Sequence, residues 1–309
     1  MSQPESAVAD AQAGGRGGQE PLAKLAARYG LRRAIARPRF PVYVRQLWER
    51  RHFILTYATS RNVSKYSSSA LGQLWQVLTP LLNAAIYYVM FGLVLGGKGH
   101  IHNYPAFLLT GMFTFTYTQR SVTAGAKSIS GNLSLIRALH FPRASLPLAY
   151  TIQELQQLAI SMGVLLVIVL ITGEPIALTW LLMPVVLLLQ TLFNVGAGLV
   201  MARLGASMRD LNQLLPFITR TWLYASGVFF SIQEKVVGTA HLPQSVADVM
   251  YYANPAASYI EAMRDILITS DGGHTPPDSV WISCVFWAVF ALCFGFWYFW
   301  RAEERYGRG

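Results

Sequence analysis

The chain has 309 residues, of which 53% are hydrophobic and only 13% are charged, and its mean hydropathy is +0.35. These values exclude a soluble globular domain and indicate an integral, all-α membrane protein. The formal net charge is +10, but twelve of the 25 Lys and Arg residues precede Ser67, against four acids, which indicates a lipid-facing arm and not a nucleic-acid surface.

The first 39 residues form this basic arm. Residues 1–20 are rich in Ala, Gly, Gln and Ser, a composition typical of disorder, and residues 22–39 are Ala-rich and basic enough for a short helix. We therefore expect a cytoplasmic arm over residues 1–39 and a membrane domain over residues 40–309.

An amphipathic helix is predicted over residues 42–57. One side carries apolar residues and the other a polar stripe: Val44, Leu47, Trp48 and Leu55 against Arg45, Glu49 and His52. This spacing, with its Arg content and its place before a membrane span, favours a helix lying in the membrane interface. An ordinary soluble helix is the alternative interpretation.

Six apolar stretches follow, each near the ~20 residues that cross a hydrocarbon core. The third and fourth are joined only by Gly173-Glu174-Pro175, which predicts a tight hairpin. The expected spans are 74–96, 105–126, 147–172, 176–202, 212–231 and 280–300.

The distribution of basic residues predicts the orientation. The segments 1–73, 127–146, 203–211 and the tail from Arg301 hold 20 of the 25 Lys and Arg residues, so we expect them, and both termini, inside. The acidic segment 232–279 is then outside. Helical spacing over 242–252 and 256–269, broken at Asn254-Pro255, predicts two short helices at the outer face.

Charged residues are rare within the expected spans. Arg120, Glu154 and Arg220 lie there, and intramembrane charges are functional by default. The simpler interpretation is an ion pair between Arg120 and Glu154 near the inner face. No cluster of acids or histidines suited to catalysis, metal binding or ion coupling is found, so we predict no catalytic, metal or cofactor site in the chain. Residues 92–99 resemble a phosphate-binding loop, but Gly99 replaces the required Ser or Thr.

The connection between the second and third spans has an unusual composition. Residues 131–147 include a short amphipathic stretch, Leu133 to Leu139, that stops at Phe141-Pro142, and they carry Arg137 and Arg143 without an acid. The stretch is too short to cross a bilayer and too apolar for an ordinary loop. We expect it to lie at the cytoplasmic surface and to contact a partner.

Aromatic residues recur in the first, second and fifth spans, away from the usual interfacial belts. Packing against lipid is one explanation, and a conduit whose aromatic faces stack on sugar rings is the other. The residues concerned include Tyr87, Tyr88, Phe113, Phe115, Tyr117, Trp222, Tyr224 and Phe229.

Four segments in this order resemble one family. They are Tyr66 to Leu82 with Leu71-Gly72, the 131–147 stretch with Phe141-Pro142-Arg143, Arg209 to Ser231, and Asn254 to Asp265. Together they are similar to the permease subunits of type-2 ABC exporters, in the branch that exports lipid-linked polysaccharides such as O-antigen, teichoic acid and galactan. Ser226-Gly227 departs from the Ser-Pro common in relatives, which leaves the bend there open.

The resemblance implies a homodimer in the bacterial cytoplasmic membrane beside two copies of a separate ATPase that binds ATP and Mg. It also implies an ATPase-coupling helix with Leu133, Arg137, His140, Phe141 and Arg143, a gate helix with Arg45, Trp48 and Arg51, a channel lined by the aromatic residues named above, and outer helices that close its mouth. A lipid-linked galactan, a cell-wall precursor, is the expected cargo. Export of a drug or small lipid, and a membrane glycosyltransferase, are the alternatives.

Overall fold

The computed structural model describes residues 38–67, 69–90, 103–139, 141–208, 210–232, 243–268 and 279–306, together with residues 236 and 241. Apart from Pro38, these residues belong to one compact unit, Arg39–Gly309. Every regular element within these ranges is helical, so the all-α prediction is confirmed there. The helix predicted over 22–39, the disorder predicted over 1–20, the 92–99 loop and His140 lie outside the described residues or almost wholly so.

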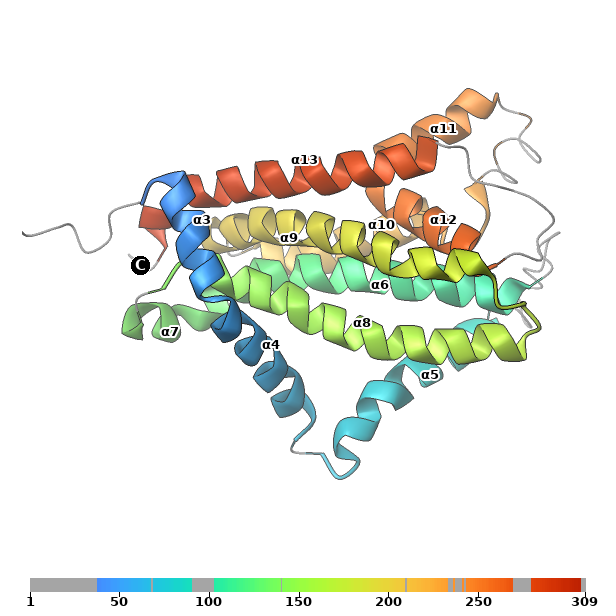
Figure 1. Cartoon of the computed structure of the whole chain (residues 1–309), viewed down its shortest axis with the longest axis horizontal. Coiled ribbons are helices and arrows are strands. Elements are labelled where there is room, and N and C mark those ends of the chain that lie inside the picture. The colour runs from blue at the N-terminus through green and yellow to red at the C-terminus, as the bar shows by residue number, and fades with distance from the viewer. Residues whose placement is uncertain are drawn as a thin grey trace, which may run out of the picture. The chain divides into compact units, whose positions relative to one another are not determined.

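Four long helices run side by side in this unit (Figure 1). They are α6 (Tyr104–Ser128), α8 (Ser145–Ile171), α9 (Met183–Ser207) with the short η5 (Leu178–Leu182) before it, and α13 (Ser279–Arg301). Among the described residues, α8, η5 with α9, and α13 are long and apolar enough to cross a membrane. With 25 residues, α6 is also long enough, at about 37 Å, but polar residues interrupt it.

Glycines let these helices approach closely. Gly196 of α9 and Gly295 of α13 face each other, and a Cβ on Gly196 would collide with the backbone of Ala291. Gly125 of α6 meets Gly198 of α9 in the same way. Between helices in lipid there is no hydrophobic driving force for association. Small residues at such crossings let the backbones approach closely, so that van der Waals packing holds the helices together. α9 is therefore the central helix, in contact with α6, α8 and α13.

The amphipathic helix predicted over 42–57 is two helices, α3 (Phe40–Glu49) and α4 (Arg51–Tyr66). The chain leaves helical geometry at Arg50, a break that no Pro or Gly marks in the sequence. Of the apolar side chains in this stretch, Tyr43, Leu47 and Ile54 are buried against the chain itself, whereas Val44, Trp48 and Leu55 are exposed.

The fifth predicted span is shorter than expected. Helix α10 covers Leu211–Ala225, and its 15 residues reach about 22 Å, less than a hydrocarbon core of ~30 Å. The helix ends because Gly227 adopts a positive φ of 66°. Proline is fixed near −65° and cannot adopt this conformation, so glycine is what permits the turn here. In the first predicted span, α5 covers Trp75–Tyr87 and the chain continues as a π turn to residue 90.

Two helices lie in the segment expected outside, α11 (Gln244–Ala253) and α12 (Pro255–Leu267). Asn254 separates them and caps α12 by accepting hydrogen bonds from Ala256 N and Ala257 N. The indole of Trp222 donates to Asn254 Oδ1 over 2.8 Å, which ties α10 to this junction.

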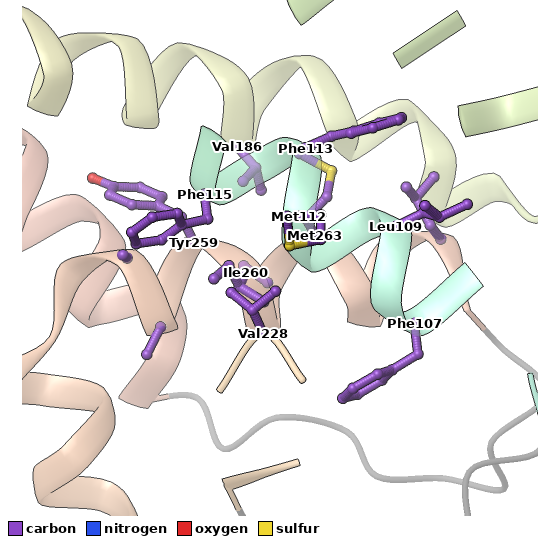
Figure 2. Close-up of a cluster of buried hydrophobic side chains, with 14 of the residues drawn as sticks. Phe107, Leu109, Met112, Phe113, Phe115, Val186, Val228, Tyr259, Ile260 and Met263 are labelled. Atoms are coloured by element: carbon purple, nitrogen blue, oxygen red, sulfur yellow. The ribbon is translucent and has the colours of Figure 1, made fainter. Parts of the chain in front are cut away.

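The largest hydrophobic cluster joins α6 to α12. Figure 2 shows part of it, with Met112 and Phe115 of α6 near Tyr259, Ile260 and Met263 of α12. All five side chains are buried. α12 is therefore packed into the bundle and does not lie loosely on its end.

At the same junction lies Arg264, whose positive charge is buried and hydrogen-bonded. Its guanidinium donates to the backbone carbonyls of Phe107, Gly227 and Val228 over 2.8 to 3.3 Å, and it lies over the Phe107 ring. Only 5% of the residue is exposed. One side chain thus fixes the start of α6, the turn after α10 and α12 together.

Candidate functional site

A cavity of about 320 Å³ lies between α5, α6, α8 and α10. Each helix presents one face to it, since the lining positions recur every three or four residues, as at Phe113, Tyr117 and Arg120 of α6. Apart from its two tyrosines, eight of the lining side chains are polar or charged: Asn83, Thr116, Gln119, Arg120, Glu154, Gln157, Ser161 and Arg220. A polar cavity is therefore built among helices that are otherwise mostly apolar.

The three intramembrane charges found in the sequence meet at this cavity. Arg120 and Glu154 are half-buried and Arg220 is exposed. The expected ion pair between Arg120 and Glu154 is not formed, because no opposite charge in the described part of the chain lies within 4.0 Å of either group. They attract each other at longer range, and Arg61 and Lys65 also act on Glu154.

The eight predicted channel aromatics divide into several groups. Tyr87, Phe113 and Tyr117 line the cavity. Phe115 points away from it, buried against the Trp222 ring at 5.6 Å, because residues two apart on a helix lie on different faces. Phe229 packs against the Tyr224 ring, with centroids 5.6 Å apart, and against the Tyr87 ring, with centroids 6.5 Å apart. Tyr88 is 36% exposed.

The prediction from sequence missed the polar members of the lining. Asn83, Gln119 and Gln157 were not selected, although Gln119 adjoins Arg120 and Gln157 follows Glu154 by three residues. Polar residues at helical spacing from an intramembrane charge are the signal that would have found them.

The connection between α6 and α8 contains the short η4 (Ser130–Asn132) and α7 (Leu133–Ala138). Of the predicted coupling residues, Leu133 and Arg137 are exposed. Phe141 instead packs against Phe53 of α4, with ring centroids 5.5 Å apart. Arg143 is also engaged with the chain itself, as described next. The predicted coupling residues therefore form two pairs: Leu133 and Arg137 are exposed, whereas Phe141 and Arg143 contact other parts of the chain.

A buried group of polar contacts, which we call the clamp, joins Tyr43 of α3, Arg143, Ala144 and Glu303. The Tyr43 hydroxyl donates to Glu303 Oε2 over 2.9 Å and accepts from Ala144 N. Arg143 donates its backbone N–H to Glu303 Oε1 over 3.1 Å, and its guanidinium donates to the Glu303 carbonyl. Burial raises the pKa of the Glu303 carboxyl, and the hydrogen bonds from Arg143 and Tyr43 oppose this shift.

A second group of hydrogen bonds joins α4 to the α6–α8 connection. The Tyr57 hydroxyl of α4 donates to Asn132 Oδ1 over 2.9 Å, and Asn132 donates to Ser128 O and to the Tyr150 hydroxyl. The α6–α8 connection, the α3–α4 pair and the tail after α13 are therefore joined by hydrogen bonds.

The predicted gate residues Arg45, Trp48 and Arg51 all lie on an outward face. Trp48 is 70% exposed, and the Arg51 guanidinium lies over its ring, 5.4 Å from the centroid. Arg45 pairs with Glu49 at 3.1 Å. Within the ranges that the structure describes, no three His, Cys, Asp or Glu side chains are grouped to hold a metal ion.

The sequence matches known proteins over most of its length. The family model described as "ABC-2 type transporter" matches residues 54–268. A protein from Klebsiella pneumoniae named O-antigen export system permease protein RfbA is 29% identical over 217 residues, which cover 70% of this chain and 80% of that protein. The protein of the same name from Myxococcus xanthus is 27% identical over 242 residues, covering 76% and 86% respectively.

Proposed function

Because the chain belongs to the ABC-2 type transporter family, we propose that it is the membrane permease of an ATP-driven exporter of lipid-linked polysaccharide. The relatives named above are O-antigen export permeases, and O-antigen is a polysaccharide. We extend that class of cargo to this chain, with a lipid-linked galactan for cell-wall synthesis as the specific proposal.

The observation that carries this proposal is the lining of the cavity. Aromatic rings of Tyr87, Phe113 and Tyr117 stand beside eight other side chains that are polar or charged. Aromatic faces stack on the apolar faces of sugar rings, while amides and charged groups bind their hydroxyls. An exporter of apolar drugs or small lipids would be expected to have an apolar cleft, so this lining favours the polysaccharide.

A membrane glycosyltransferase is disfavoured on different grounds. It would need acidic residues at a sugar-nucleotide site on the inner face, and the inner connections 127–146 and 203–211 contain only Asp210. Among the residues that line the cavity, Glu154 is the one carboxylate. The chain is therefore proposed as a transporter subunit, with ATP and Mg bound by a separate ATPase.

The proposed assembly is a homodimer of six-span subunits in the bacterial cytoplasmic membrane, beside two ATPase subunits. Both termini and the arm over residues 1–39 are then cytoplasmic, and α11 and α12 are at the outer face. The exposed Leu133 and Arg137 of α7 are suited to contact the ATPase. Phe141 and Arg143 would pass the resulting movement to α4 and to the clamp.

The test is export in a strain that lacks this chain. Its deletion is expected to leave the lipid-linked glycan inside the cell, and the wild-type chain is expected to restore the glycan to the surface. A normal amount of surface glycan in the deletion strain would contradict the proposal.

A second measurement tests the division of the coupling residues. The Leu133→Ala, Arg137→Ala double variant should lose co-purification with the ATPase while remaining folded. Met208→Ala is the matched control, because it removes an exposed apolar side chain from the connection after α9. Equal loss in both variants would mean that α7 is not the specific contact.

A further inference from the structure

Two guanidinium groups and one carboxylate face the cavity, so its charged lining is unbalanced. Arg120 comes from α6 and Arg220 from α10, opposite a single acid, Glu154 of α8. Within the described ranges, Arg120 makes neither a hydrogen bond nor an ion pair. An arginine within a membrane protein is costly unless it has a partner, and in the part of the chain that the structure describes Arg120 has only the longer-range attraction of Glu154.

The two arginines are held at the same level of the bundle. Gln119 donates from Nε2 to Thr219 Oγ1 over 3.1 Å, which joins α6 to α10 one residue before each arginine. The Thr219 side chain is anchored in turn, since its hydroxyl donates to Leu215 O over 2.8 Å. The side chains of Arg120 and Arg220 therefore enter one cavity from two helices fixed to each other.

The chemistry of the pair points to a phosphate group. Guanidinium groups bind phosphate oxygens through paired N–H donors, in a geometry that neutral sugar hydroxyls do not require. Resting on the function proposed above, we propose that Arg120 and Arg220 bind the diphosphate that links lipid to glycan in the cargo. Glu154 competes with the diphosphate for these guanidiniums and so keeps its binding reversible.

Binding can be measured without transport, with the full-length chain in octaethylene glycol dodecyl ether, a detergent that contains neither sugar nor phosphate. The probe is farnesyl diphosphate, a short polyprenyl diphosphate. Arg120→Gln and Arg220→Gln are each expected to weaken its binding about tenfold or more. Glu154→Gln is expected to leave binding unchanged or to tighten it.

The matched control is Arg301→Gln, which removes one positive charge at the end of α13, outside the cavity. It is expected to leave the affinity unchanged. Arg120→Lys and Arg220→Lys keep the charge without the paired donors, so they are expected to bind with intermediate affinity. They also replace the Gln variants if these aggregate in gel filtration.

Competitors identify the source of the phosphate. Displacement of the probe by inorganic pyrophosphate would support a site for the diphosphate itself, whereas equal displacement by phosphatidylglycerol would overturn the assignment to cargo. Binding of lactose that is lost in Glu154→Gln would overturn it in favour of a sugar site. If the Gln and Lys variants of Arg120 and Arg220 all bind the probe with the affinity of the wild type, the assignment is also overturned.

The two proposals can fail separately. If export depends on the chain but farnesyl diphosphate does not bind, only the diphosphate site is wrong. If the probe binds through both arginines but the deletion strain exports its glycan normally, the site stands and the proposed function fails.

Discussion

Arg264 and the pair formed by Arg120 and Arg220 are arginines of one bundle in opposite circumstances. Arg264 is buried and gives its donors to the carbonyls of Phe107, Gly227 and Val228. Arg120 is half-buried beside a cavity and has no such acceptor among the described residues. Because a buried charge is stable only when it is paired, the first arrangement belongs to the fold, and the second is left for a ligand.

The largest effect on stability is expected for Arg264→Ala. The change leaves three backbone carbonyls without their donor and opens a void at the junction of α6 and α12, so we expect a loss of roughly 3 kcal/mol or more. Thermal unfolding in detergent, followed by gel filtration, measures it. If Arg264→Ala proves as stable as the wild type, the distinction between the two kinds of arginine is lost.

The clamp is a second region in which buried polar groups have hydrogen-bond partners, and Glu303→Ala tests its contribution to stability. The change removes the acceptor of the Tyr43 hydroxyl and of Arg143 N, at a cost of about 2 kcal/mol. Faster proteolysis of the α6–α8 connection is the expected sign that it has been released. Glu304→Ala, at the neighbouring and less buried position, is the matched control and is expected to change stability less.

Because Glu303 can take up a proton, the stability that the clamp contributes depends on pH. This effect is expected to be smaller than that of Glu303→Ala. Burial raises the pKa of this carboxyl, so the folded chain binds its proton more readily than the unfolded chain does. Its contribution to stability is therefore fully present below the ordinary value of 4.5 and is lost as the pH rises through the raised value. Unfolding measured across this range should show the slope in the wild type, and Glu303→Gln should remove it.

Much of the fold was predictable because α8, α9 and α13 follow directly from long apolar runs, and α6 from a run that polar residues interrupt. The ends of shorter elements were not. The break at Arg50 has no Pro or Gly to mark it, and α10 stops at Ala225 because Gly227 takes a positive φ that only the tertiary structure requires. Local sequence patterns do not contain these tertiary constraints.

The cavity was only partly predictable, for a related reason. Arg120, Glu154 and Arg220 were recognisable as intramembrane charges, yet the expected pairing of the first two was wrong because both face a shared space. That space is formed by four helices distant in sequence, and spacing along one helix cannot reveal it. Phe115 is different, because helical spacing alone separates it from Phe113 and Tyr117.

The smallest effect on stability is expected for Arg220→Gln, and this is what makes it informative. Arg220 is exposed and makes no hydrogen bond or ion pair among the described residues, so the free energy of unfolding should change by less than about 0.5 kcal/mol. Export of the glycan should nevertheless fall, since the cavity loses one of its two guanidiniums. Arg264→Ala lowers export only as far as it lowers the amount of folded chain. A fall in export per folded molecule in Arg220→Gln alone would therefore separate the ligand-binding arginine from the structural one.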